Sequence, residues 1–446
     1  MRIRTRARSP AREEPHFKNI AEAGNRYLKN CLNRQRALIE KLLKLWNIHS
    51  HSMIKIPNYI GPLAFGVKMG VILPGDDIVA NVYEAVKRCD EDGLIDDGDI
   101  LCVTESVVAK AQNNYVSRRE IAEEVRKRLG LSEKDNLGIL YPIASRNRFV
   151  PILESLAKAV SNGEITLQFS FPTDCVGNQL VPEDLDKQLD RDLLTDEISF
   201  DELKKTRFHH PATGINYITL YSETIEKEGA KPNIFLSNDP RRITKYRPDG
   251  IIVSCIHERR RIFQKIKKMF NNTITLDDLH NEPNNNAWSE WGLLGSNLHS
   301  PELIKLAPRE SSKVARNIQA KIRDKIGKKT EVLIYGDGAY KDPSTGIYEL
   351  ADPVCSFGHT DGLVTRRKGI KYKYLVGMLW SQGKSRREIE KHIEKEKTRS
   401  YKIDDDSMEG TTPRKLEDIA ASLADLVSGS ADAGTPLVVI KNLMRI

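Results

Sequence analysis

The residue types best suited to phosphate and metal chemistry occur together near the end of the chain, in residues 331–353. The stretch opens with the apolar run Val332–Tyr335, which predicts a buried strand. A Gly-Asp-Gly segment follows at 336–338, then Lys-Asp-Pro at 341–343. Glycines let a backbone approach a phosphate, carboxylates bind divalent cations and a lysine places a point charge near a phosphate. The same residues are common in turns, so this stretch alone favours a strand followed by two polar turns over a binding site.

A second candidate phosphate site follows another apolar run. Ile100–Thr104 predicts a buried strand, and Glu105–Ala111 continues it as a polar turn that contains Lys110. A phosphate can be bound where a strand leads into a polar turn and a lysine. The glycine-rich Walker loop is missing from this segment, so the pattern is not a P-loop. Taken alone, Lys110 fits a surface lysine better than a ligand-binding one.

Strand and helix patterns alternate along the chain and predict a mixed α and β architecture, of the α+β class. Asp76 or Asp77 is expected to cap a helix over 78–88. Residues 181–206 are acidic and predict solvated helices, whereas the polar stretch 271–300 predicts a long loop. Further helices are expected at 117–129, 152–163, 215–228, 259–269, 311–326, 371–399 and 413–427, and strands at 165–169, 233–236, 250–255 and 436–440.

The composition and charge of the chain exclude several classes of protein. The chain has 446 residues, 39% hydrophobic and 30% charged, as in globular proteins, and no apolar run is long enough to span a bilayer. The six cysteines lie far apart without a CxxC pair, which argues against a zinc knuckle or a disulfide framework and favours a cytoplasmic protein. Residues 1–52 hold 12 basic and 4 acidic side chains, the entire net charge of +8. The rest is therefore electrically balanced, and we expect no nucleic-acid partner.

The basic segment 1–52 is expected to be separate from the remainder. Its first 16 residues are rich in arginine and poor in large apolar groups, which predicts disorder. A helical pattern follows in 17–46. Met53 begins a segment that resembles the natural start of a domain. Two explanations of residues 1–52 therefore stay open: an extension of the protein, or a misassigned start codon. We expect one catalytic region to occupy 53–446, with an insertion at about 181–310.

Several segments together resemble one family, the ligases that add glutamate to the precursor of coenzyme F-420, a deazaflavin. The first is Gly75-Asp76-Asp77 before a helix. The second is the segment 98–111, GDILCVTESVVAKA. It resembles a family segment in which a Gly-Asp pair leads into an apolar strand and then a Lys-Ala pair. The segments 417–424 and 434–440 resemble its closing helix, glycine loop and strand. The resemblance covers most of 54–444, and the segments around 336–353 resemble a longer bacterial branch.

The resemblance implies a ligase-like fold and a GTP-dependent reaction with Mg²⁺ or Mn²⁺, commonly on a homodimer. A substrate carboxylate would become an acyl phosphate, and the amine of L-glutamate would displace the phosphate to form an amide. A triphosphate needs cations near its charge, and the metal needs oxygen ligands. The implied partners are small molecules, a carboxylic acid and L-glutamate.

By position, the resemblance also implies nucleotide-binding residues. Lys110 corresponds to the family lysine that contacts the nucleotide phosphates, and Ser106 lies in the segment that contacts nucleotide. Residues Met69, Gly70, Val71 and Ile72 occupy the place of the loop that contacts guanine. The resemblance assigns no catalytic acid or base.

Two metal positions depart from the family pattern. An aspartate in a Gly-Ile-Asp segment corresponds here to Asn216, a neutral amide. A second family aspartate corresponds to Asp337 when the alignment is shifted by one residue, and Asp342 and Asp352 are possible compensating carboxylates. Two alternatives stay open: a ligase for a different acid and amino acid, and a nucleotide-binding protein without turnover.

Overall fold

The computed structural model describes residues 56–57, 59–283, 286–294, 296–336, 340–341, 348–349, 356–364, 366–367, 371–398, 414–428 and 434–445. The helix expected within 17–46 and the carboxylates Asp337, Asp342 and Asp352 lie outside these residues. By its contacts the chain separates into two units. One of them, Asn58–Arg88 with Ile95–Ile446, is compact and contains the two larger sheets.

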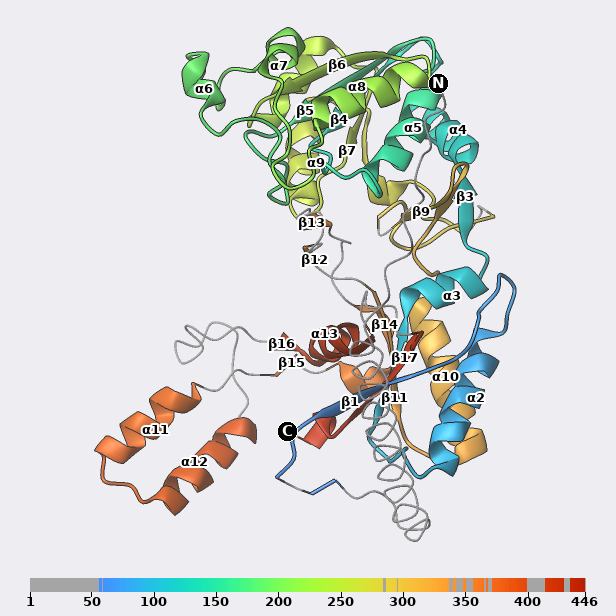
Figure 1. The fold of residues 1–446 in the computed structure, drawn as a ribbon, viewed down its shortest axis with the longest axis vertical. Helices are drawn as coiled ribbons and strands as arrows, with labels where there is room; N and C mark the ends of the chain where they lie inside the picture. The colour runs from blue at the N-terminus through green and yellow to red at the C-terminus, as the bar shows by residue number, and fades with distance from the viewer. Residues whose placement is uncertain are drawn as a thin grey trace, which may run out of the picture. The chain divides into compact units, whose positions relative to one another are not determined.

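The first of these, which we call the mixed sheet, has the strand order β1-β17-β2-β11-β14 (Figure 1). Only β2 and β11 are parallel, and the other neighbours are antiparallel. Helix α13 (Leu416–Ser428) packs small side chains, such as Ala420 and Ala424, on one face, while α10 (Ser311–Ile326) packs against β11 and β14. The strands are β1 Leu63–Val67, β17 Leu437–Lys441, β2 Ile100–Thr104, β11 Glu331–Tyr335 and β14 Ser356–His359.

The second, which we call the parallel sheet, has the order β6-β5-β4-β7-β8, and every pair in it is parallel. Helices α4, α5 and α8 share a core with one face, while η1 and α9 pack on the other (Figure 1). Burial of both faces explains the continuous apolar runs of its strands. The elements are α4 Arg118–Leu129, β4 Asn136–Leu140, α5 Phe149–Ala159, β5 Glu164–Phe169, α8 Tyr217–Lys227, β6 Lys231–Leu236, η1 Pro240–Tyr246, β7 Gly250–Val253, α9 Arg259–Lys267 and β8 Thr273–Thr275.

Smaller elements complete the described fold. Strands β3, β10 and β9 form an antiparallel sheet, and β12 with β13 and β15 with β16 form two-stranded pairs. These strands are β3 Tyr115–Ser117, β9 Asn297–Ser300, β10 Leu303–Lys305, β12 Tyr340–Lys341, β13 Tyr348–Glu349, β15 Arg366–Arg367 and β16 Arg414–Lys415. The remaining helices are α2 Ile78–Glu91, α3 Glu105–Ala111, α6 Leu185–Gln188, α7 Phe200–Thr206, α11 Tyr372–Ser381 and α12 Arg386–Thr398.

The expected α+β class is confirmed, as are most of the predicted helices and strands. Four local expectations are wrong. The stretch 271–300 is not one long loop, because it contains β8, the short 3-10 helix η2 (Leu276–Asp278) and β9. The segment 105–111 is the helix α3 rather than a turn, and 181–206 contains only the short helices α6 and α7. The charged region 371–399 divides into α11 and α12, because Gly383 adopts a left-handed φ of 77° between them. The bounds of the insertion stay a prediction.

Candidate functional site

Strand ends from four distant parts of the sequence meet at one edge of the mixed sheet. Since β2 and β11 are parallel, their carboxyl ends coincide, with Thr104 opposite Tyr335. The antiparallel strand β17 begins at this edge, where Thr104 N donates to Pro436 O at 2.9 Å. Strand β1 ends there too, with Val67 opposite Leu437. The loops that leave these strands therefore surround one site, which we call the polar edge.

Helix α3 starts at the polar edge, directly after β2, and carries two of the predicted nucleotide-binding residues. Ser106 is exposed in its first turn, and Lys110 is half-buried in its last turn. Within the described residues the Lys110 ammonium makes no ion pair, so its charge is available to an anion. Gly75 N donates to Ala111 O at 2.9 Å and holds the preceding turn against the end of α3. The predicted cap of α2 is confirmed in Asp77, whose Oδ1 accepts from Ala80 N at 3.0 Å.

A buried ion pair fixes the first turn of α3. Lys305 Nζ lies 2.8 Å from Glu105 Oε1 and 2.9 Å from Oε2, and each side chain is only 10% exposed. Both carboxylate oxygens are thus occupied by Lys305. A β-carbon on Gly336 would lie 2.7 Å from Glu105 Cγ and 2.3 Å from Phe357 Cε2. The glycine at the end of β11 is therefore needed for the close approach of its backbone to α3.

Two buried hydroxyl oxygens at the polar edge make no hydrogen bond within the described part of the chain. They are Thr435 Oγ1, just before β17, and Ser356 Oγ, at the start of β14. A β-carbon on Gly66 would lie 2.7 Å from Thr435 Oγ1, so Thr435 packs directly over β1. Buried polar groups rarely lack a partner, and such groups often mark a binding site. The two hydroxyls therefore suggest a ligand with polar atoms.

At the opposite edge of the mixed sheet, the charged side chains pair with one another. Lys441 Nζ lies 2.7 Å from Asp99 Oδ2 and 2.9 Å from Asp96 Oδ2. In the sheet itself, burial raises the pKa of the Cys102 thiol far above its usual range, so this group stays neutral. One buried hydroxyl at this edge, Thr330 Oγ1 just before β11, also makes no hydrogen bond within the described residues, so unpartnered polar atoms are not confined to the polar edge.

The predicted nucleotide loop also reaches the polar edge. Residues Met69–Ile72 follow the end of β1, where Gly70 has a left-handed φ of 79°. Ile72 is 4% exposed and anchors the loop, whereas Val71 is 81% exposed. The structure therefore brings this loop, Ser106 and the glycine that precedes Asp337 to the same sheet edge. Their contacts with a nucleotide stay a prediction.

The structure describes only one of the three predicted metal ligands, Asn216. Asn216 caps helix α8, and its Oδ1 accepts from Thr219 N at 3.0 Å. Asp337 and Asp342 lie outside the described residues. Among the residues that are described, no group of three or more His, Cys, Asp or Glu side chains could hold a metal ion. The metal site therefore stays a prediction.

Sequence reasoning did not select Glu105, Lys305, Ser356 or Thr435. One signal was present, because Lys305 interrupts the apolar segment 303–307, LIKLA. A lysine in a buried run requires a carboxylate partner, but nothing local identifies Glu105, which lies 200 positions away. The hydroxyls of Ser356 and Thr435 have no distinctive spacing in the sequence. Their shared position at the polar edge follows only from the strand order.

The polar edge of this α+β fold has the unpartnered buried hydroxyls that often mark a binding site. A family model described as F420-0:Gamma-glutamyl ligase matches residues 66–442. The chain belongs to this family and is a ligase, which confirms the resemblance inferred from the segments near both ends. No curated protein matches the chain. Across the described residues, no helix has the length and apolar character needed to cross a membrane.

Proposed function

We propose that the protein forms an amide between L-glutamate and the carboxylate of the coenzyme F-420 precursor, with GTP as the source of energy. Family membership supports the glutamate transfer. A phosphorylated intermediate at the polar edge is supported by polar groups that have no partner within the described structure. Buried hydroxyls of Thr435 and Ser356 lie beside strand ends that allow close backbone approach. Lys110 lies in the last turn of α3, the helix that starts at this edge, and its ammonium makes no ion pair within the described structure.

In the proposed reaction, an oxygen of the acceptor carboxylate attacks the γ-phosphorus of GTP, and the bond to the bridging oxygen breaks to release GDP. The glutamate amine then attacks the acyl carbon, the bond to the phosphate oxygen breaks and phosphate leaves, while the amine loses a proton to solvent. Lys110 would offset phosphate charge, and the hydroxyls of Ser106 and Thr435 would donate hydrogen bonds to phosphate oxygens. Positioning and electrostatic stabilisation account for most catalysis of phosphoryl transfer.

The proposal includes a divalent cation, Mg²⁺ or Mn²⁺. The donors present at the polar edge are oxygens, which are the ligands such hard cations prefer. Asp337, the next residue after Gly336, is the proposed carboxylate ligand, with Asp342 as a second and Asn216 as a neutral one. When bound, the cation would neutralise charge that develops on the phosphate oxygens. Calorimetric titration with Mn²⁺ should show weaker binding to Asp337→Ala than to the wild type, and equal binding would show that another group is the ligand.

Titration with GTP tests the role of Lys110. Loss of a charge-assisted contact worth about 1.5–3 kcal/mol predicts at least about tenfold weaker binding to Lys110→Ala. Lys325→Ala is the matched control, because Lys325 is also a lysine in the last turn of a helix, α10, and is exposed. Absence of GTP binding to the wild type would overturn the proposal, and equal losses in the two variants would remove Lys110 from the site.

Turnover and assembly need separate measurements. GDP release with the F-420 precursor and L-glutamate should exceed release with either compound alone, and a panel of other acids and amino acids tests the alternative acceptors. We include a homodimer in the cytoplasm in this proposal because the family resemblance implies the dimer and the widely spaced cysteines fit a reducing compartment. A monomeric mass by light scattering would contradict the dimer without affecting the ligase proposal.

A further inference from the structure

Helices α11 and α12 form a hairpin with a small core of its own (Figure 1). The apolar side chains of this core all come from the two helices. They are Leu379, Ile389 and Ile393, with Val376 and Met378 packed against them. A pair of helices this short buries little apolar surface by itself. Much of the surface of α11 is therefore open to a partner.

Three aromatic side chains of α11 lie on the outside of the hairpin. Tyr372 is 59% exposed, Tyr374 is 64% exposed and Trp380 is 70% exposed. Tyr374, Gly377 and Trp380 follow one another at intervals of three residues, so they lie along one side of the helix. A β-carbon on Gly377 would meet no atom within 4 Å, so the space between the two rings is open. Large apolar groups exposed together in this way mark an interaction surface.

The same segment carries a local excess of positive charge. Residues 371–387, KYKYLVGMLWSQGKSRR, contain five basic side chains and no acidic one. Between described residues, none of the five makes an ion pair. The expectation of no nucleic-acid partner depends on the balanced total charge of residues 53–446, and a total does not register a local excess. The five residues are Lys371, Lys373, Lys384, Arg386 and Arg387, and with the three exposed rings they make up what we call the basic aromatic face.

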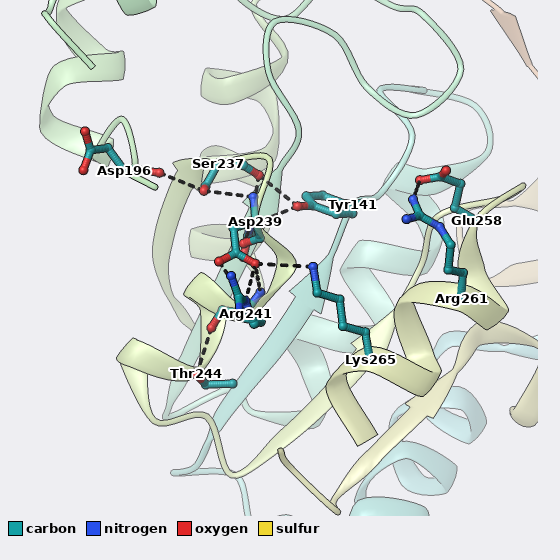
Figure 2. A network of polar contacts seen from close by, with 10 residues as sticks. Tyr141, Asp196, Ser237, Asp239, Arg241, Thr244, Glu258, Arg261 and Lys265 are labelled. Atoms are coloured by element: carbon teal, nitrogen blue, oxygen red, sulfur yellow. Dashed lines mark hydrogen bonds and ion pairs between the residues drawn. The ribbon is translucent and has the colours of Figure 1, made fainter. Parts of the chain in front are cut away.

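The basic residues of η1 and α9 behave differently, because they have acidic partners (Figure 2). Arg241 Nε lies 2.9 Å and Lys265 Nζ 3.8 Å from Asp239 Oδ1. Burial opposes ionisation of Asp239, but the hydrogen bonds and charge of Arg241 outweigh it and lower the Asp239 pKa. Arg261 likewise pairs with Glu258. Positive charge is thus met within the chain at this second cluster, whereas the charge of the basic aromatic face is left for a partner.

The turn between the two helices fixes the charges beside the rings. Gly383 N donates to Trp380 O at 2.9 Å and closes the end of α11. Ser385 then caps α12, and its N donates to Glu388 Oε2 at 2.8 Å. The backbone of Lys384 is therefore held directly after the helix that carries Trp380. Rings and cations are presented together by a backbone that is already ordered.

We propose that the basic aromatic face binds single-stranded nucleic acid. The exposed rings stack on bases, and the ammonium and guanidinium groups contact phosphates. A second copy of the chain does not fit, because two such faces would bring like charges together. An interfacial helix buries a continuous apolar side in lipid, whereas the aliphatic side chains of α11 face α12. This surface stands independently of the proposed nucleotide site at the polar edge.

Fluorescence anisotropy of a labelled oligouridylate of about 12 nucleotides, titrated with the full chain, tests the stacking. Loss of one stacked base predicts at least about fivefold weaker binding to Trp380→Ala. Trp380→Leu should lose as much, because it keeps an apolar side chain without a ring, whereas Trp380→Tyr should keep most of the affinity. Tyr59→Ala is the matched control, since Tyr59 is an aromatic residue outside the face and is 88% exposed. It should bind as the wild type does.

The salt dependence of the same titration tests the phosphate contacts. Each contact with a single strand contributes about 0.7 to the slope of log K against log salt, so Arg386→Gln/Arg387→Gln should reduce the slope by about 1.4. Arg316→Gln/Lys325→Gln is the control, because it removes the same charge from exposed positions of α10. It should leave the slope unchanged. The comparison also cancels any contribution of the basic segment 1–52, which all the variants retain.

Three results would overturn the proposal: no binding of the oligouridylate by the wild type, equal affinities of the wild type and Trp380→Ala, or equal slopes for the two double variants. Vesicles of equimolar phosphatidylcholine and phosphatidylserine, and polyglutamate, are titrated in parallel. If either binds as tightly as the oligouridylate and loses binding with Trp380→Ala, the face belongs to a membrane or an acidic protein instead. Circular dichroism verifies the folding of each variant, and the contrast between Trp380→Leu and Trp380→Tyr remains decisive if Trp380→Ala does not fold.

Discussion

Breaking the Glu105–Lys305 ion pair should destabilise the protein far more than breaking a surface pair. At 2.8 Å, two unit charges attract by about 6 kcal/mol at an effective dielectric constant of 20. Desolvation offsets part of this attraction, because both side chains are only 10% exposed. Lys305→Met keeps most of the side-chain volume but leaves the Glu105 carboxylate buried without its cation. We therefore expect a loss of about 3–5 kcal/mol in the free energy of unfolding.

A double-mutant cycle separates the pair from its surroundings. Glu105→Gln keeps the shape of the side chain without its charge, and the double variant Glu105→Gln/Lys305→Met leaves no buried charge. The double variant should lose at least about 1.5 kcal/mol less than the two single variants combined, since contacting residues couple by about 0.5–3 kcal/mol. Urea unfolding is followed by circular dichroism and by tryptophan fluorescence. Trp291 is a useful reporter because its ring lies 6.0 Å from that of Phe357, which adjoins Gly336.

Arg119→Met is the matched control for this cycle. Arg119 Nε lies only 2.7 Å from Glu123 Oε1, but the side chains are 80% and 49% exposed. We expect no measurable change in stability from this variant, because solvent screens the pair. Two results would show that burial does not make the Glu105–Lys305 pair important for stability. One is a change from Lys305→Met as small as that from Arg119→Met, and the other is simple addition of the two single effects in the double variant.

Two further predictions concern packing and cysteine chemistry. Gly336→Ala should lower the melting temperature and weaken GTP binding, because the new β-carbon would lie 2.3 Å from Phe357 Cε2. Gly61→Ala is the control and should change neither quantity, since its β-carbon would meet no atom within 4 Å. Equal effects of the two variants would contradict the packing argument. Burial and the Asp174 charge raise the pKa of the Cys175 thiol to about 12. Iodoacetamide should therefore label Cys175 very slowly at pH 8 and about tenfold faster for each added pH unit up to about 11, as measured by peptide mass spectrometry. Rapid labelling at pH 8 in the folded protein, with free cysteine as the reference, would contradict this assignment.

The sequence predicts much of the local structure because the relevant forces are local. The strand 100–104 and the helix 311–326 occur with the predicted bounds. Their apolar spacing reflects which side chains must be buried. The helix α3 was mistaken for a turn, since its seven residues are too few to show a helical period. Small and acidic residues in 181–206 likewise imitate helical spacing without forming more than two short helices.

The candidate sites depend on strand order, which a single sequence does not specify. Ser356 is an ordinary serine until β14 is placed beside β11. Thr435 lies near the end of the chain, and its position at the polar edge requires β17 to insert between β1 and β2. The family resemblance directs attention to the segment with Ser106 and Lys110, whose role stays a prediction, but it provides no information about the nearby hydroxyls and ion pair.

The strand order also explains how the polar edge joins distant segments. Because β17 is antiparallel to both neighbours, it begins at the edge where β1 and β2 end, so Gly66 and Thr435 come into direct contact. Strand β11 adds Gly336 on the far side of β2, and only a residue without a side chain fits between Glu105 and Phe357. The last strand of the chain is thus part of the support of the first candidate loop, Met69–Ile72. A change at either end of the sequence should therefore affect the same site.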